Sequence, residues 1–465
     1  MNRKERNHFL KLFYDLGDFI RGFIGIVVAI SFLINKIGFT KSVFIIVVLV
    51  IAVLIYKFLS WRKNFFIIKE NSIYHEKGIL SIKKIEIPFE RINTIDISQR
   101  FLERIFKAAT IKIDTGDTKN SGSELKFTLN KERAEELRDI LLKKETDTDG
   151  GQQDKFYTMK PKGIIIYSLI SNSVFKGIGM LLVAQQFFDE YLKRFIKIDI
   201  SQYGDRLQNG SFYYRIYVIT SVLLVLVFIS VCLSIIYNFL KYYDFKMWTD
   251  NKKIYINYGA ISKKSYSFDK EKVKGIHIKQ SILMQCFGFF TMEIENIGYG
   301  DEKGEKAILY PICSSFLKNE IIENLLGEFK YSGIINKPKI NASFRFFYKK
   351  VILWAIIGVI CFFIRPKFVL LTLMILLFFL VLGYLEFRNT AFGMDKNLVY
   401  MGYNSFNKTR SILKMTAVQS VTLSRSYFQR RRGFCDYIII LYSSTASKVL
   451  KVKNLKDDVV DEVFR

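Results

Sequence analysis

The sequence has few of the residues from which catalytic and metal sites are built. It holds three histidines, His8, His75 and His277, and its five cysteines are widely spaced with no CxxC pair. This scatter leaves no zinc-binding pattern and no catalytic histidine constellation. Glycine-rich nucleotide loops and the HExxH and GxSxG motifs are also absent. We therefore expect a protein that is not an enzyme, with no catalytic residues, no metal and no cofactor.

Apolar residues and positive charge are both abundant. Half of the 465 residues are hydrophobic, 15% are aromatic, and 70 lysines and arginines against 43 acids give a net charge of +27. Long uncharged runs separate the cationic parts, which is typical of a membrane protein with basic cytoplasmic regions. Nucleic-acid binding also favours a basic chain, but the apolar runs make it the weaker interpretation, and we expect no nucleic-acid partner.

One stretch, Arg91–Ile113, recurs twice. Its copies are Lys272–Ile294 and, more diverged, Ala417–Ile439. In each copy apolar residues alternate with polar ones, a short link follows, and the alternation resumes. Alternation with a period of two indicates half-buried strands, and an internal repeat of this kind indicates a chain built from like units. The sequence therefore predicts three β-rich units.

Apolar runs precede each β-rich unit in pairs. Runs near the roughly 20 residues that a bilayer requires predict membrane-spanning helices. We therefore expect about six transmembrane helices, arranged as three hairpins. The runs are Gly22–Ile34, Ser42–Tyr56, Gly163–Phe188, Ile216–Leu240, Val351–Ile364 and Phe368–Leu385.

Composition sets the expected boundaries. The first twenty residues are basic and amphipathic, as in a helix on a membrane surface, and polar stretches rich in turn residues read as linkers. Each β-rich unit is expected to close with an amphipathic helix. The expected order is an amphipathic N-terminus and hairpin at 1–61, a β-rich unit at 62–148, a linker at 149–162, a hairpin at 163–240 with an external loop at 189–215, a unit at 241–330, a linker at 331–349, a hairpin at 350–385 and a unit at 386–465.

Lysine and arginine set the expected orientation. They are frequent at the N-terminus and directly after each hairpin, whereas the hairpin tips carry fewer or balance them with acids. Short flanks rich in these residues stay in the cytoplasm. We therefore expect a multi-pass membrane protein with both termini and all three β-rich units cytoplasmic.

The first repeat carries a family resemblance. The phrase IPFERINTIDISQRFLERIF, residues 87–106, follows a turn from Asn71 to Gly78 and resembles the bacterial pleckstrin-homology-like (PH-like) membrane proteins of the YdbS/YdbT type. The second repeat keeps Gly259 and Gln280, and the third has Asn404 where the first has Gly78. The resemblance implies three PH-like β-barrel domains, each capped by one helix, and no established catalytic residues. It also implies the bacterial plasma membrane as the location, a role in resistance to membrane-active bacteriocins and, as a partner, a smaller single-unit PH-like membrane protein.

Basic residues are the candidate site for lipid or partner binding. Pairs recur at similar places in the three units, and a denser cluster with aromatic neighbours lies in the third. Cations near an anionic leaflet contribute roughly 1 kcal/mol each, although lysines on edge strands also discourage aggregation. The candidate residues are Lys83, Lys84, Lys263, Lys264, Lys408, Arg410, Arg430, Arg431 and Arg432.

These features favour a non-enzymatic membrane protein whose PH-like domains bind lipid headgroups or protein partners at the inner leaflet, in envelope protection. Two alternatives stay open. One is a transporter or lipid-handling protein, for which Lys176 within an apolar run is the one suggestive residue. The other is a docking subunit for another membrane protein. Fold alone does not decide among them.

Overall fold

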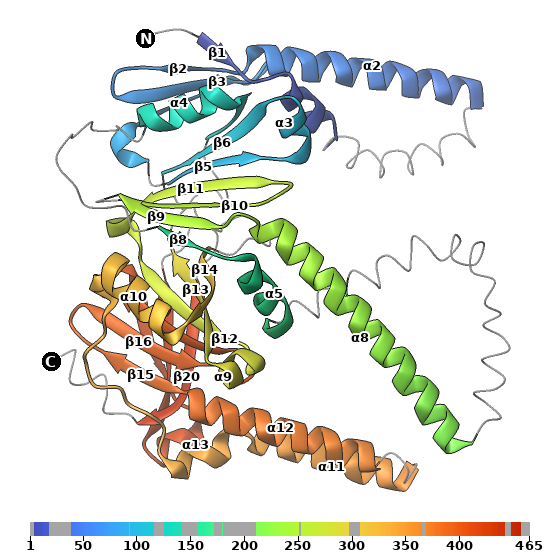
Figure 1. The fold of residues 1–465 in the computed structure, drawn as a ribbon, viewed down its shortest axis with the longest axis vertical. Helices are drawn as coiled ribbons and strands as arrows, with labels where there is room; N and C mark the ends of the chain where they lie inside the picture. The colour runs from blue at the N-terminus through green and yellow to red at the C-terminus, as the bar shows by residue number, and fades with distance from the viewer. Residues whose placement is uncertain are drawn as a thin grey trace.

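The computed structural model describes residues 4–17, 39–92, 94–115, 125–141, 156–171, 179, 211–250, 253–296, 307–364, 369–441 and 448–456. Within these residues, β-rich units follow one another as a stack, and apolar helices extend from the same side of it (Figure 1).

The first unit packs two antiparallel sheets around one core. Alternate strand residues such as Phe66, Ile95 and Phe127 are fully buried in it, as the period-two pattern predicts. The C-terminal helix buries Ala134 and Leu137 against the same core. The elements are β1 (Lys4–Arg6), β2 (Phe65–Ile68), β3 (Ser72–Lys77), β4 (Lys83–Pro88), β5 (Thr94–Gln99), α3 (Phe101–Ile105), β6 (Ala108–Asp114), β7 (Leu125–Asn130) and α4 (Lys131–Leu141).

The second and third units repeat this plan. The second has β8 (Tyr157–Thr158), β9 (Lys246–Asp250), β10 (Lys253–Tyr258), β11 (Lys263–Asp269), β12 (Gly275–Gln280), α9 (Ile282–Phe287), β13 (Phe289–Glu295), β14 (Ile308–Ser314) and α10 (Ser315–Leu325). The third has β15 (Ala391–Met394), β16 (Leu398–Tyr403), β17 (Lys408–Lys414), β18 (Val418–Ser424), α13 (Tyr427–Arg430), β19 (Phe434–Leu441) and β20 (Lys448–Lys456). The closing helix expected in the third unit lies largely outside the described residues.

A segment from before the apolar helices joins the first sheet of each unit. β1 pairs with β2, and β8 pairs with β9. In the third unit a single bridge joins Asn336 to Phe392. Residues expected in a surface helix or in linkers thus include strand residues. The apolar helices are inserted between the first and second pairing segments of each sheet, which anchors both ends of each insertion in the unit.

The units are joined edge to edge through continuous sheets. β5 of the first unit pairs antiparallel with β11 of the second, and β12 of the second pairs antiparallel with β17 of the third. The strand orders are β1-β2-β3-β4, β7-β6-β5-β11-β10-β9-β8, β14-β13-β12-β17-β16-β15 and β18-β19-β20. Main-chain hydrogen bonds across two sheets therefore fix the order of the three units.

The expectation of six transmembrane helices is wrong for the described part of the chain. Two stretches there are long and apolar enough to cross a membrane, Leu224–Tyr242 and Val369–Asn389, and a bent pair of helices would make a third. In the described part of the run from Gly163, the helix is the ten-residue α5 (Pro161–Ile170), which by itself is too short to span a bilayer. The rest of that run after Ser171 lies almost entirely outside the described residues, as does the whole run Gly22–Ile34. The apolar helices are α2 (Phe39–Lys63), α5, α8 (Phe212–Tyr242), α11 (Tyr348–Ile364), which is bent against the 3-10 helix η4 (Ile340–Phe346), and α12 (Val369–Asn389).

One turn recurs in every unit. Gly78 and Gly259 have φ of 119° and 114°, and Asn404 has φ of 72°. A Cβ on Gly259 would lie 2.0 Å from the Ser262 carbonyl oxygen, and one on Gly78 would lie 1.9 Å from that of Ser81. Asparagine is among the few other residues that adopt positive φ readily. The sequence correctly indicated Asn404 at this turn in the third unit.

Candidate functional site

The predicted basic pairs fall on three equivalent strands but do not meet in one place. Lys83 and Lys84 lie on β4 at the outer edge of the first sheet, where Lys84 Nζ is 4.0 Å from Glu76. Lys408 and Arg410 lie on β17, where the second and third units join. Lys263 and Lys264 lie on β11, at the joint between the first two units. They line the largest of the three cavities described below.

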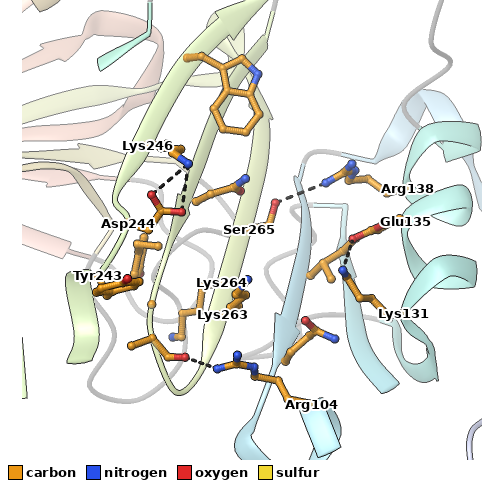
Figure 2. A pocket seen from close by; sticks show the side chains of 17 residues that line it. Arg104, Lys131, Glu135, Arg138, Tyr243, Asp244, Lys246, Lys263, Lys264 and Ser265 are labelled. Atoms are coloured by element: carbon orange, nitrogen blue, oxygen red, sulfur yellow. Dashed lines mark hydrogen bonds and ion pairs between the residues drawn. The ribbon is translucent and has the colours of Figure 1, made fainter. Parts of the chain in front are cut away.

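A basic cleft opens at this first joint. Figure 2 shows side chains of α4 on one side, β9 and the end of α8 on the other, and Lys263 and Lys264 between them. Its volume is about 590 Å³, and we call it the first cleft. Six of its lining residues are cationic and two are acidic. The cations are Arg104, Lys131, Arg138, Lys246, Lys263 and Lys264, and the acids are Glu135 and Asp244.

The first cleft lies directly at the end of an apolar helix. Tyr243, which lines it, is the residue after α8, and Leu224–Tyr242 is one of the two candidate membrane spans. The backbone N–H groups of Gly259 and Ala260 donate to the carbonyls of Tyr243 and Leu240. Carbonyls at the end of a helix lack partners within the helix, so the turn before Lys263 caps α8. This capping holds the basic strand beside the helix end.

The ion pairs leave the cleft cationic. Lys246 Nζ is 3.0 Å from Asp244, and Lys131 Nζ is 3.8 Å from Glu135, both between partly exposed side chains. Arg138 donates to Ser265 Oγ at 3.4 Å, and Arg104 donates to the Ala260 carbonyl across the joint. Exposed ion pairs contribute little, but like charges gathered in a concave site raise its potential for anions. The arrangement suits a phosphate group.

The equivalent cavity at the second joint has a different character. Its volume is about 210 Å³. Three positions of the repeat line both cavities: Gln99, Gly259 and Lys264 in the first cleft are replaced here by Gln280, Asn404 and Thr409. We call it the second cleft. Its charged lining residues are Lys279 and Glu293, which form an ion pair with each other. Arg410 faces a separate cavity of about 320 Å³ with Lys318, Glu323 and Lys330.

The arginine cluster of the third unit lies at the opposite end of the stack. Arg430 ends α13, and the guanidinium of Arg431 lies 5.4 Å from the Tyr427 ring centroid. Arg345 donates to the Phe428 carbonyl and lies over the Phe434 ring. The cluster is therefore a cationic and aromatic surface separate from the first cleft.

Sequence reasoning missed four of the six cations of the first cleft. Arg104 and Arg138 come from the first unit and Lys246 from the second, so only the edge-to-edge joint brings them together. Lys131 begins a helix and reads as an ordinary surface charge. Lys176, on which the transport alternative rested, lies outside the described residues.

Paired sheets closed by a helix, interrupted by apolar helices, are the features of a membrane protein with PH-like domains. The chain belongs to the Bacterial PH domain family, which matches residues 14–145, 198–314 and 351–465. This confirms the family resemblance of the first repeat. The family is one of PH-like membrane proteins and not a known class of enzyme.

A curated relative covers most of the chain. UPF0699 transmembrane protein YdbT of Bacillus subtilis (strain 168) is 23% identical over 427 residues, which are 86% of this chain and 84% of that protein. No solved structure matches the chain significantly.

Proposed function

We propose that the first cleft binds the phosphate-bearing headgroup of an anionic lipid at the inner membrane surface. The observation that carries the proposal is the position of six cationic side chains at the end of α8. If α8 crosses the bilayer, its C-terminal end and the first cleft beside it lie at the level of the lipid headgroups. Each cation near such a surface contributes roughly 1 kcal/mol, and arginine adds directed hydrogen bonds to phosphate oxygens.

This proposal includes an orientation. All three units and both termini face the cytoplasm, where anionic lipids concentrate and where lysine-rich and arginine-rich flanks remain. Lys241 and Lys246, on either side of the end of α8, are flanks of this kind. Labelling Lys246→Cys, in a chain that also carries Cys286→Ser to remove the exposed native cysteine, with a membrane-impermeant maleimide in intact cells tests the orientation. Labelling only after the cells are opened supports it, and labelling of intact cells contradicts it.

Native mass spectrometry of the full detergent-solubilised chain tests headgroup binding. We expect more phosphatidylglycerol than phosphatidylcholine adducts on the native chain, and loss of that preference in Lys263→Ser/Lys264→Ser. The matched control is Lys83→Ser/Lys84→Ser, which changes the equivalent pair outside the cleft. Equal loss in both variants would contradict a specific cleft. If the native chain binds free inorganic phosphate in the first cleft and added phosphatidylglycerol does not displace it, the ligand is a soluble anion and not a lipid headgroup.

We further propose that headgroup binding serves envelope protection, including resistance to membrane-active bacteriocins, as the family resemblance implies. A smaller single-unit PH-like membrane protein is the proposed partner in this role. Deletion should sensitise cells to a panel of membrane-active peptides. A variant with Lys83, Lys84, Lys263 and Lys264 changed to serine should reach normal membrane levels without restoring resistance. Unchanged sensitivity after deletion would overturn the protective role.

A further inference from the structure

The two joints within the chain use the same strand register. At the first, Lys263 lies opposite Gln99 and Phe268 opposite Thr94. At the second, the corresponding residues pair in the same way from end to end, with Lys408 opposite Gln280 and Leu413 opposite Gly275. Twice, therefore, the last strand of one unit's first sheet pairs with the first strand of the preceding unit's second sheet.

The same two edges are unpaired at the ends of the stack. Among the strands that the structure describes, β4 pairs only with β3, and β18 pairs only with β19. β4 is the counterpart of β11 and β17, and β18 is the counterpart of β5 and β12. Burial reflects the missing neighbours, because four of the six residues of β5 are buried but none of β18 is.

We propose that β18 of one molecule pairs with β4 of a second copy of this chain and continues the stack. The shared register places Lys83 opposite Ser424, Ile85 opposite Thr422 and Ile87 opposite Ser420. An edge strand with unpaired main-chain groups is a template for a further strand, and here the chain itself supplies strands of the matching kind. Nothing in this pairing depends on lipid binding in the first cleft.

Side-chain alternation in the two edge strands agrees with this register. At the first joint, core residues of one unit lie opposite polar residues of the other, as Ile97 does opposite Ser265 and Phe268 opposite Thr94. In the proposed joint, Ile87 of the first core lies opposite Ser420. Leu423, which packs on the third core, lies opposite Lys84. Each strand thus turns its apolar face to its own core.

The lysines of β4 do not protect it from pairing. Lys83 and Lys84 could be taken as charges that keep an edge strand single, but β11 carries Lys263 and Lys264 at nearly the same positions and is paired. A cross-joint contact also has its counterpart. At the first joint, Lys272 Nζ donates to the Ile92 carbonyl at 2.7 Å. In the repeat, Arg91 corresponds to Lys272 and Val418 corresponds to Ile92. In the proposed joint, Arg91 of one copy therefore lies beside Val418 of the other.

The assembly is head to tail. Joining one end of the stack to the other end of a copy is a heterologous contact, which produces a row or a closed ring instead of a symmetric dimer. The apolar helices extend from one side of the stack (Figure 1), as rows lying along a membrane require.

Site-directed cross-linking of the full chain in isolated membranes tests the proposal. The parent chain carries Cys286→Ser, which removes the exposed native cysteine. Two differently tagged chains, one with Lys83→Cys and one with Ser424→Cys, are co-expressed and treated with a short bismaleimide. We expect a cross-linked dimer carrying both tags, and a ladder of higher species when both cysteines are in one chain.

The controls separate a register-specific joint from chance encounters. Lys83→Cys with Ser420→Cys is out of register, and we expect at least tenfold less product. Equal yields from the two pairs, dimers formed by Lys83→Cys chains alone, or cross-links only to a smaller protein that carries neither tag would each overturn the proposal.

Discussion

The two joints share a strand register and differ in what surrounds it. At the second joint, Leu398 and Ile412 of the third unit join the core of the second. The ring of His277 is buried there, with its Nδ1 2.6 Å from Ser411 Oγ and its Nε2 3.0 Å from Glu295 Oε2. At the first joint the core of the first unit stops at β5, and the adjoining space is a basic cleft. The same backbone pairing therefore accompanies a shared apolar core at the second joint and, at the first, the larger basic cleft that we propose as a headgroup site.

Charge reversal in the first cleft should have the largest effect. Lys263→Glu/Lys264→Glu removes two cations and adds two anions, so we expect phosphatidylglycerol affinity to fall about a hundredfold or more. Thr409→Glu, at the counterpart of Lys264 in the second cleft, should change it less than twofold. Native mass spectrometry over a lipid titration measures both, and similar losses in the two variants would remove the distinction between the joints.

Removing the turn glycine should come next. Gly259→Ala places a Cβ against the Ser262 carbonyl in a backbone with φ of 114°, and strain of this kind costs about 1–3 kcal/mol. We expect a lower melting temperature and weaker headgroup binding, because this turn caps α8 and positions Lys263. Gly327→Ala, where a Cβ would meet nothing within 4 Å, is the control. Equal melting temperatures would show that the turn is not strained.

Transferring charge to the second joint should produce a smaller gain. Thr409→Lys with Glu293→Gln adds one cation and neutralises the acid that pairs with Lys279. We expect phosphatidylglycerol binding there to strengthen about tenfold. The gain is measured as phosphatidylglycerol adducts on a chain that also carries Lys263→Ser/Lys264→Ser, so that the first cleft does not contribute to the signal. No gain would mean that the smaller volume of the second cleft, and not its charge, excludes the headgroup.

The smallest effect should appear only in acid. Burial lowers the pKa of His75 to about 4, with nearby Lys77, Lys11 and Lys83 adding to the shift. The folded state then binds fewer protons than the unfolded state between about pH 6.5 and pH 4. Neutral His75 therefore makes its full contribution to the free energy of unfolding above about pH 6.5, and that contribution is lost as the pH falls towards 4.

A methionine variant isolates this contribution. Met401 holds the position of His75 in the third unit, so His75→Met is a replacement that the fold already contains. We expect native and variant chains to lose melting temperature differently between pH 6.5 and 4, with the steeper fall in the native chain. Parallel curves would contradict a depressed His75 pKa.

Local sequence patterns predicted the local structure well. Period-two alternation identified strands such as β5 and β12, and the Gly78, Gly259 and Asn404 positions predicted turns whose φ angles are positive. Hydropathy alone overestimated the transmembrane helices, because an apolar run such as that from Gly163 does not reveal where its helix ends. The described helix α5 takes eight residues of that run and ends at Ile170.

The joints and the cleft could not be predicted in the same way. β1 and β8 have three and two residues and are defined by distant partners, so no periodicity marks them. Pairing of β5 with β11 depends on residues more than 160 positions apart, such as Gln99 and Lys263. Arg104 and Lys246 become neighbours of one cavity only through that pairing. Sequence reasoning found the two lysines on β11 but not the cleft they line.

A structure of the full chain in phosphatidylglycerol nanodiscs would test the central claim most directly. The account predicts phosphate density in the first cleft within hydrogen-bonding distance of Lys263, Lys264 or Arg104, and none in the second cleft. An empty first cleft, or phosphate held instead at Arg430–Arg432, would contradict it.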